Sequence, residues 1–334
     1  MELKDVGEFG LIDLIKADTI QDANSVVVGI GDDAAVVLPS PKQLQVLTTD
    51  MLVEGIHFDL SLSLPWQLGH KAMAVNLSDI AAMGGVPRHA LVSLALPQRL
   101  TTDFVVDLYQ GMKEICREFR VNIVGGDTVA SPDGLVINVT VLGEVEPRNL
   151  VRRSGARVGD WVAVTGTLGN AAAGLDLLQM EDWEEEPFAW PLVKAHLTPR
   201  PQVAAGKHVA SAGATSMNDI SDGLASELNE IAVASNVGIR IYADRLPVSS
   251  ELDIAVYKLD KLPLEYVLYG GEDYELVFTI REPNFNLVSQ AALSNFGVKL
   301  TRIGEVVGDA TGVTLVHSDE RTEKISPRGY NHFR

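Results

Sequence analysis

The amino-acid sequence predicts a two-domain α/β protein, and three observations lead to this fold class. The 334 residues are roughly twice the length of an ordinary domain, and 46% of them are hydrophobic, which is enough to form compact cores. Short apolar segments typical of strands alternate with longer segments that have helical periodicity. A polar, basic and glycine-containing segment at 146–161 separates two apolar strands. We therefore place the domain boundary there, with domains at 1–148 and 149–334.

In the first domain, the order of strands and helices favours a mixed sheet. Strands are predicted at 26–30, 34–39, 44–49, 89–97, 122–124 and 135–145. Residues 65–83 have apolar side chains spaced by three and four, which predicts an amphipathic helix that ends at a Gly-Gly pair. A second helix is predicted at 101–119 with Thr102 as its N-cap, and a Gly-Gly-Asp turn follows the strand at 122–124. Since helices do not separate all strands at crossover spacing, this order argues against a strict Rossmann repeat.

The second domain again contains both element types. Strands are predicted at 161–166 and 274–280, and helices at about 171–180, 201–212, 222–236 and 283–296. An acidic insert at 181–190 interrupts this order, and its composition predicts a solvated surface loop.

The composition restricts both partners and location. A formal net charge of −18 opposes general affinity for DNA, RNA or anionic membranes, which bind basic surfaces, and it favours cations as ligands. The chain has no long apolar run and no secretory signal at its start, so we expect a cytoplasmic protein. Its single cysteine, Cys116, lies in an apolar-periodic segment and is predicted to be a core residue.

Acidic residues recur in turns that directly follow strand-like segments. They are Asp32, Asp33, Asp50, Asp127, Asp219, Asp222, Glu272 and Asp273. The backbone preferences of turns explain any one of them, but carboxylates gathered at strand ends repel one another unless a cation lies among them. Asp79 adds a carboxylate from a helix end, and Thr48 and Thr49 add hydroxyl or carbonyl oxygens beside Asp50. Hard oxygen ligands of this kind suit Mg²⁺, so the sequence predicts a multi-metal site.

Magnesium held by a few carboxylates keeps coordination positions for phosphate oxygens, which indicates a nucleotide di- or triphosphate. The chain has neither a GxxxxGK[ST] loop nor the HRD and DFG motifs of protein kinases. Residues 29–34 match the G-x-G-x-x-A dinucleotide fingerprint. We reject this match because a strand follows it instead of a helix, and two carboxylates would face the anion.

Three further residues have two interpretations each. His57 is either a ligand-binding residue or an ordinary loop histidine, and Tyr109 is either a binding residue or part of the core. Arg153 either contacts phosphate or forms an ion pair at the domain junction.

Eight segments, taken in order, resemble the thiamine-monophosphate kinase family over nearly the whole chain. They are GIGDDAA, TTDMLVEGIHF, KAMAVNLSDIAAMGG, IVGGDT, RSGARVGDWVAVTG, NDISDGL, GGEDYEL and GYNHF. GGD and SDG elements occur across the wider aminoimidazole ribonucleotide synthase-related superfamily. The segments TTDMLVEGIHF, NLSDIAAMG and GGEDYEL are the discriminating ones.

The resemblance implies a fold and an assembly. The fold is the aminoimidazole ribonucleotide synthase-like α/β (α+β) fold, in which N-terminal mixed sheets of two subunits pair into a β-barrel and form a homodimer. The N-terminal domain would bind ATP and magnesium, and the C-terminal α/β domain would close the active site.

The resemblance also implies the reaction and its residues. ATP would phosphorylate thiamine monophosphate to thiamine diphosphate, with several Mg²⁺ ions bound. The metal ligands would be Asp33, Thr48, Thr49, Asp50, Asp79, Asp127, Asp219 and Asp222, and the catalytic carboxylates Asp33, Asp50, Asp79, Asp127 and Asp219. ATP would contact Tyr109, Gly126, Asp127, Arg153 and Ser221, and thiamine monophosphate would contact His57, Glu272 and Tyr330. Phe333 is the alternative to Tyr330, and Asn331 stands where the family pattern has Asp.

The chemistry of the acceptor agrees with the lack of an evident general base. A phosphate monoester has a second pKa near ~6, so its attacking oxygen is largely anionic at neutral pH. We therefore predict direct in-line transfer without a phospho-enzyme. The alternatives are another ATP-dependent ligase or kinase of the superfamily and, in a different class, a non-catalytic protein that binds divalent cations or thiamine diphosphate.

Overall fold

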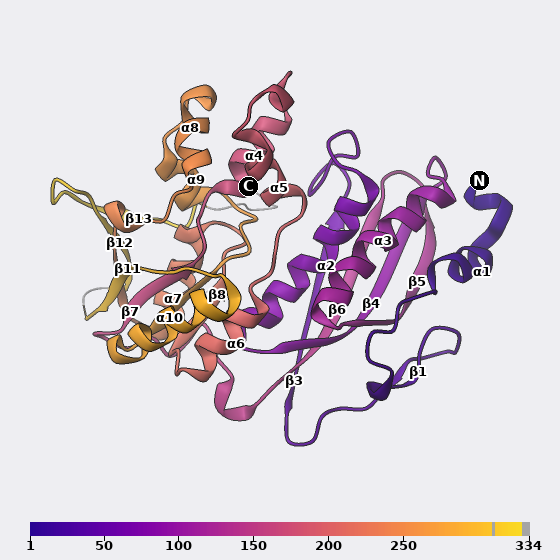
Figure 1. Cartoon of the computed structure of the whole chain (residues 1–334), viewed down its shortest axis with the longest axis horizontal. Helices are drawn as coiled ribbons and strands as arrows, with labels where there is room; N and C mark the ends of the chain where they lie inside the picture. Colours follow the sequence, from indigo (N-terminus) through magenta and orange to yellow (C-terminus); the bar gives the residue numbers. More distant parts are fainter. Residues whose placement is uncertain (309–310, 329–334) are drawn as a thin grey trace. The chain divides into compact units, whose positions relative to one another are not determined.

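The computed structural model describes residues 1–308 and 311–328, so the predicted substrate residue Tyr330 and its alternative Phe333 lie outside the described residues. The chain divides into two compact units (Figure 1). Unit 1 comprises Met1–Ile80 and Val86–Pro147, and unit 2 comprises Ala81–Gly85 and Arg148–Arg334.

Unit 1 is built on a four-stranded mixed sheet in the order β3-β6-β4-β5. Its strands are β3 (Leu44–Val53), β4 (Val86–Pro97), β5 (Asn122–Ser131) and β6 (Val136–Val145), and its helices are α1 (Leu3–Ile15), α2 (Pro65–Ala82) and α3 (Thr102–Phe119). Figure 1 shows α2 and α3 over one face of this sheet. Burial alternates along β6, with Ile137, Val139 and Val141 fully buried, because only one face of the sheet is covered by helices.

Helix α2 is buried around almost its whole circumference, so the prediction of an amphipathic helix is wrong. Side chains from Leu68 to Ala82 are buried, apart from the half-buried His70 and Asp79. Two glycines allow α2 and α3 to cross in backbone contact: a Cβ at Gly69 would lie 1.8 Å from the Leu108 carbonyl oxygen, and one at Gly111 1.7 Å from that of Trp66. The mostly small and apolar side chains of α2 allow this packing on every side.

Helix α3 has the predicted extent, but Thr102 is not its N-cap. Thr101 has an extended backbone, and its hydroxyl accepts a hydrogen bond from the Phe104 amide at 3.3 Å. Thr102 is the first helical residue, and its own hydroxyl donates to the Met1 carbonyl at 3.2 Å. The N-cap needs non-helical backbone angles, and only Thr101 has them.

The predicted Gly-Gly-Asp turn is also wrong, because Gly125, Gly126 and Asp127 lie within strand β5. Strand β5 runs parallel to β4, and a register shift between Ala90 and Leu91 passes over Val124. A Cβ at Gly126 would lie 1.7 Å from the Val92 carbonyl oxygen, so this pairing requires glycine.

Before this sheet, β1 (Val26–Val28) and β2 (Val36–Val37) form a two-stranded antiparallel sheet. Residues 29–34 join the two strands, so the dinucleotide-like segment opens no helix, as predicted.

Unit 2 contains a seven-stranded sheet in the order β13-β12-β9-β11-β7-β10-β8. Its strands are β7 (Trp161–Thr165), β8 (Ser216–Asp219), β9 (Gly238–Tyr242), β10 (Leu276–Ile280), β11 (Leu300–Val307), β12 (Gly312–Val316) and β13 (Thr322–Ile325). Its helices are α4 (Asn170–Leu178), α5 (Ala189–Leu197), α6 (Val203–Ser211), α7 (Leu224–Ser235), α8 (Ser250–Leu259), α9 (Pro263–Tyr269) and α10 (Glu282–Phe296). Two predicted strands and four predicted helices of this half are found as β7, β10, α4, α6, α7 and α10.

The acidic insert is mostly exposed, but it is not only a loop. Trp183–Glu185 form a short 3-10 helix, and the ring of Trp183 stacks on that of Trp190 at 6.1 Å. Helix α5 begins at Ala189, inside the predicted loop, because this residue is fully buried against the core of the unit.

No helix within residues 1–308 and 311–328 is long and apolar enough to cross a membrane.

Candidate functional site

In unit 1, four predicted or neighbouring polar side chains meet between β3 and α2. Thr48 and Asp50 are half-buried on one face of β3 and alternate with exposed neighbours, while Asn76 and Asp79 lie one turn apart on α2. The Thr48 hydroxyl donates a hydrogen bond to the Asp79 carboxylate, and the Asp50 amide donates to the Asn76 side-chain oxygen at 3.1 Å. The sheet and the helix therefore place Asp50 and Asp79 in one polar cluster.

The two carboxylates of this cluster influence each other. Burial and, secondarily, the negative charge of Asp79 raise the pKa of Asp50 to about 6. A bound cation would relieve both costs, so the donor set of two carboxylates and a hydroxyl fits a hard ion such as Mg²⁺. Among residues 1–308 and 311–328, however, no group of three or more His, Cys, Asp or Glu side chains is arranged to hold a metal ion.

Thr49 and Asp127 lie on the opposite face of the same sheet. The register aligns Asp50 with Val139, Val92 and Gly126, whereas Asp127 follows Gly126 and therefore points to the other face. The Thr49 hydroxyl lies on that face, 2.9 Å from the hydroxyl of Thr140.

The remaining predicted residues of unit 1 lie apart from the cluster or have structural contacts. Asp33 is exposed in the segment between β1 and β2, where its amide donates to the Asp32 side chain at 2.8 Å. His57 accepts a hydrogen bond from the Val53 amide at 3.0 Å and so closes the turn after β3. Tyr109 is buried, with 4% of its surface exposed, which corresponds to its interpretation as a core residue.

In unit 2, Asp219 ends strand β8 and is buried with 4% exposure. The loop after it leads into helix α7, whose Glu227 is also buried and accepts a hydrogen bond from the Asp222 amide at 3.2 Å. Burial and, to a smaller extent, the negative charges of Glu230 and Asp219 raise the pKa of Glu227 to about 9. A third carboxylate therefore lies beside the two predicted ones.

Arg153 has partners within unit 2. Its Nε lies 3.2 Å from a carboxylate oxygen of Glu230, and it donates to the side-chain oxygen of Asn218 at 3.0 Å. Asn218 in turn donates to Glu227 and, at 3.0 Å, to Glu230. These contacts correspond to the ion-pair interpretation of Arg153, with a partner in its own unit.

The GGEDYEL segment, residues 270–276, packs against the loop after β8. The Glu272 amide donates to the Ser221 carbonyl at 2.7 Å, and the Tyr274 amide donates to that of Ile220 at 2.9 Å. This pairing brings Ser221 and Glu272, which are fifty-one positions apart in the sequence, next to each other.

Adjacent carboxylates of this segment have different environments. The Asp273 carboxylate accepts hydrogen bonds from the amides of Gly169 at 2.6 Å and Ala171 at 3.3 Å, at the N-terminus of α4. The Glu275 carboxylate accepts from Thr165 and, at 3.2 Å, from Gln202. Burial raises the pKa of Asp273 to about 7 and that of Glu275 to about 8. The Asp273 and Glu275 carboxylates are therefore held by hydrogen bonds within the unit, whereas the side chain of Glu272 is 28% exposed.

The sequence interpretation missed several polar residues at these places. They are Asn76, Asn218, Glu227, Glu230 and His196. Nδ1 of His196 lies 3.0 Å from Oε2 of Glu272. A signal existed for Asn76, which precedes Asp79 by three residues and so shares its helix face. No local signal links His196 to Glu272, because α5 and the GGEDYEL segment meet only in the folded unit.

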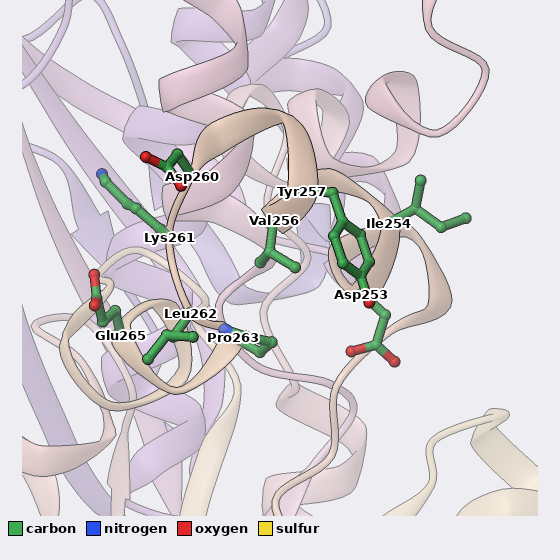
Figure 2. Close-up of a pocket in the computed structure, with 9 residues that line it drawn as sticks. All are labelled: Asp253, Ile254, Val256, Tyr257, Asp260, Lys261, Leu262, Pro263 and Glu265. Atoms are coloured by element: carbon green, nitrogen blue, oxygen red, sulfur yellow. The ribbon is translucent and has the colours of Figure 1, made fainter.

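A separate hollow on unit 2 lies between α8 and α9 (Figure 2). It is lined by Asp253, Ile254, Val256, Tyr257, Asp260, Lys261, Leu262, Pro263 and Glu265. None of the predicted site residues lines this hollow.

Comparison with known proteins gives matches over both units. Residues 31–145 match the N-terminal domain of AIR synthase related proteins, and residues 157–317 match their C-terminal domain. The chain is 40% identical to the thiamine-monophosphate kinase of Bacillus subtilis, over 98% of this chain and 99% of the relative. It is 42% identical to that of Aquifex aeolicus, over the full length of both chains.

Solved structures agree with these matches. The thiamine-monophosphate kinase of Stenotrophomonas maltophilia has a TM-score of 0.82 at 34% identity, with 93% of this chain and 96% of that chain covered. A structure described as AaThiL complexed with AMPPCP and TMP has a TM-score of 0.79 at 39% identity, with 100% of this chain and 99% of that chain covered. The hydrogenase maturation protein HypE, at 20% identity and a TM-score of 0.73, shares the fold.

Proposed function

Because this chain belongs to the thiamine-monophosphate kinase family of AIR synthase related proteins, we propose that it transfers the γ-phosphoryl group of ATP to thiamine monophosphate. The products are thiamine diphosphate and ADP. Full-length similarity to kinases of this name carries the proposal, and the ATP analogue and TMP in the complex of a relative support it. A reaction that consumes ATP is also consistent with the cytoplasmic location expected from the sequence.

We propose Mg²⁺ as the metal, with ligands in both units. In unit 1 the clustered Thr48, Asp50 and Asp79 support this assignment, and in unit 2 Asp219 and Asp222 do so beside Glu227. Asp33, Thr49 and Asp127 are ligands by resemblance alone. When bound, Mg²⁺ neutralises the negative charge of the phosphate groups and of the transition state.

The residues of the chain have to bind and align the reactants rather than remove a proton. The acceptor phosphate has its second pKa near ~6, so its attacking oxygen is already anionic at neutral pH. We therefore propose direct in-line transfer. Incubation with γ-labelled ATP should leave no label bound covalently to the denatured protein, and labelled protein would contradict direct transfer.

The substrate and ATP residues of the family pattern are carried over as part of the proposal. The Glu272 carboxylate complements the positively charged thiazolium of thiamine. His57 and a C-terminal aromatic residue are the other substrate residues that the resemblance implies. For ATP we propose, by resemblance alone, Tyr109, Gly126, Asp127, Arg153 and Ser221, although the side chain of Tyr109 is buried in the core of unit 1. Arg153 already pairs with Glu230, so an ATP phosphate would have to share or replace this carboxylate.

A homodimer is supported by an uncovered apolar face of the unit 1 sheet. Leu47 is 64%, Met51 55%, Leu91 36% and Val129 50% exposed. The strand register places all four on the face opposite to α2 and α3. A second copy of the chain would cover these side chains, as in the β-barrel that the resemblance implies.

Product analysis tests the proposed function directly. The purified protein is incubated with ATP, Mg²⁺ and thiamine monophosphate, with free thiamine as a parallel substrate, and the products are separated by chromatography. Thiamine diphosphate formed only from the monophosphate supports the proposal. If folded, ATP-binding protein consumes neither compound, the assigned substrate is wrong.

A further inference from the structure

The main chain around Glu272 is held in an uncommon conformation. Glu272 has φ of 67° and Tyr274 has φ of 50°, both in the left-handed region that residues with a Cβ rarely adopt. Such angles persist when the surrounding contacts determine them. Here the contacts are the hydrogen bonds of these two amides to the loop after β8 and the anchoring of Asp273 at the N-terminus of α4.

The side chain of Glu272 is held by a second element. His196 lies in the last turn of α5, and its Nδ1 is 3.0 Å from Oε2 of Glu272. The His196 side chain is 9% exposed, so its ring has little freedom, whereas the Glu272 side chain is 28% exposed. A buried imidazole with little freedom therefore lies against a carboxylate that remains partly open to solvent.

The two elements that hold Glu272 are packed directly against each other. Asp273 anchors the segment on α4, and α4 packs closely on α5: a Cβ at Gly174 would lie 2.1 Å from the carbonyl oxygen of Leu192. The main chain around Glu272 and its side chain therefore both contact one pair of closely packed helices, α4 and α5. A carboxylate held in this way loses little freedom when it binds a ligand.

We propose that His196 is a positioning residue that orients the Glu272 carboxylate for the cationic part of thiamine monophosphate. This inference rests on the proposed function and on the substrate role of Glu272. Nδ1 of His196 lies 3.0 Å from the carboxylate, and a neutral imidazole carries no positive charge, so this close contact restricts the carboxylate and leaves its negative charge available to the thiazolium. A lysine or arginine at this place would neutralise that charge.

Steady-state kinetics of two variants test the proposal. His196→Ala should raise the KM for thiamine monophosphate roughly tenfold, while kcat and the KM for ATP change less than about twofold. His196→Asn retains an amide donor close to the position of Nδ1 and should restore most of the loss. A merely structural histidine would lower activity towards both substrates together and would not be rescued selectively by asparagine.

A double-mutant cycle isolates the contact. Glu272→Gln alone should raise the same KM, and adding His196→Ala should cause little further change, because the group that His196 orients is already altered. Fully additive effects on the KM would overturn the proposal, even if the wild-type enzyme forms thiamine diphosphate.

His208→Ala is the matched control. His208 is a histidine of α6 in the same unit, and its ring packs edge-on against Phe296 at 5.6 Å. The His208→Ala variant should leave the KM for thiamine monophosphate unchanged, and melting curves of all variants show whether they fold.

If His196→Ala does not fold, the comparison of folded His196→Asn with folded His196→Gln tests the inference instead, and equal KM values for these two variants would overturn it. If wild-type protein does not use thiamine monophosphate, product analysis shows that the proposed function itself has failed.

Discussion

At the scale of single residues, carboxylates that look equivalent in the sequence have different tasks in the fold. Asp50 and Asp79 form a partly buried pair, whereas Asp33 lies in an exposed segment. The side chain of Glu272 is 28% exposed, while the carboxylate of its neighbour Asp273 accepts hydrogen bonds from amides at the N-terminus of a helix. The spacing of acidic residues therefore located the polar segments of the fold, and only the contacts showed how buried each carboxylate is and which groups it pairs with.

Replacing Asp79 tests the metal assignment in unit 1. Asp79→Asn removes one negative charge from the pair with Asp50, so we expect kcat to fall by about a hundredfold or more at saturating Mg²⁺. Asp103→Asn is the control, because this carboxylate on α3 is 86% exposed. Substantial activity of Asp79→Asn at saturating Mg²⁺ would remove Asp79 from the ligand set.

Replacing the two adjacent carboxylates of the GGEDYEL segment tests their division of tasks. Glu272→Ala should raise the KM for thiamine monophosphate more than that for ATP and change stability little. Asp273→Ala should lower the free energy of unfolding by about 1–3 kcal/mol, because the amides at the N-terminus of α4 lose their acceptor. Urea unfolding and substrate titrations measure both effects. Equal losses for both substrates in Glu272→Ala would argue for a structural role.

At the scale of elements, periodicity located long helices and strands well but missed what packing decides. Helices α3, α7 and α10 lie where the sequence predicted them. The Gly-Gly-Asp turn was wrong because a neighbouring strand, β4, offers backbone partners that outweigh the turn preference of glycine. Helices α1, α5, α8 and α9 were not predicted, although α8 has Ser249 as its N-cap, with the hydroxyl accepting from the Leu252 amide at 3.1 Å.

The start of β10 gives a prediction on pH. Burial raises the pKa of Glu275 to about 8 in the folded protein, against an ordinary value of 4.5. The folded state therefore holds a proton that the unfolded state releases, so this contribution to stability is complete below about pH 4.5 and is lost as the pH rises towards 8. The loss is at most about 1.4 kcal/mol per pH unit.

Unfolding by urea at pH 5.5 and pH 8 measures this effect in wild type and in Glu275→Gln. We expect the wild type to lose more stability than the variant between the two values, since glutamine keeps the contacts with Thr165 and Gln202 but does not titrate. The same loss in both proteins would show that Glu275 does not carry the proton.

At the scale of the whole molecule, the uncovered apolar face of the unit 1 sheet predicts the assembly. Leu47→Asp places a charge on this face, where Leu47 is 64% exposed, and should convert a dimer into a monomer. Light scattering coupled to gel filtration measures the mass. Val233→Asp is the control, because Val233 is equally open, at 70% exposure, on α7 of the other unit. A wild-type monomer would contradict the proposed dimer.

The sequence by itself determined the α/β class, the extent of the strongly periodic helices, and the family, because apolar spacing and motif order are local properties of the chain. It also located the segments in which carboxylates gather. The tertiary structure decided which of these side chains meet: Asp50 with Asp79, Glu227 with Asp222, and His196 with Glu272. The physical reason is that strand register, helix crossing and burial arise from contacts between distant segments, and these contacts set the geometry and the charge of each group.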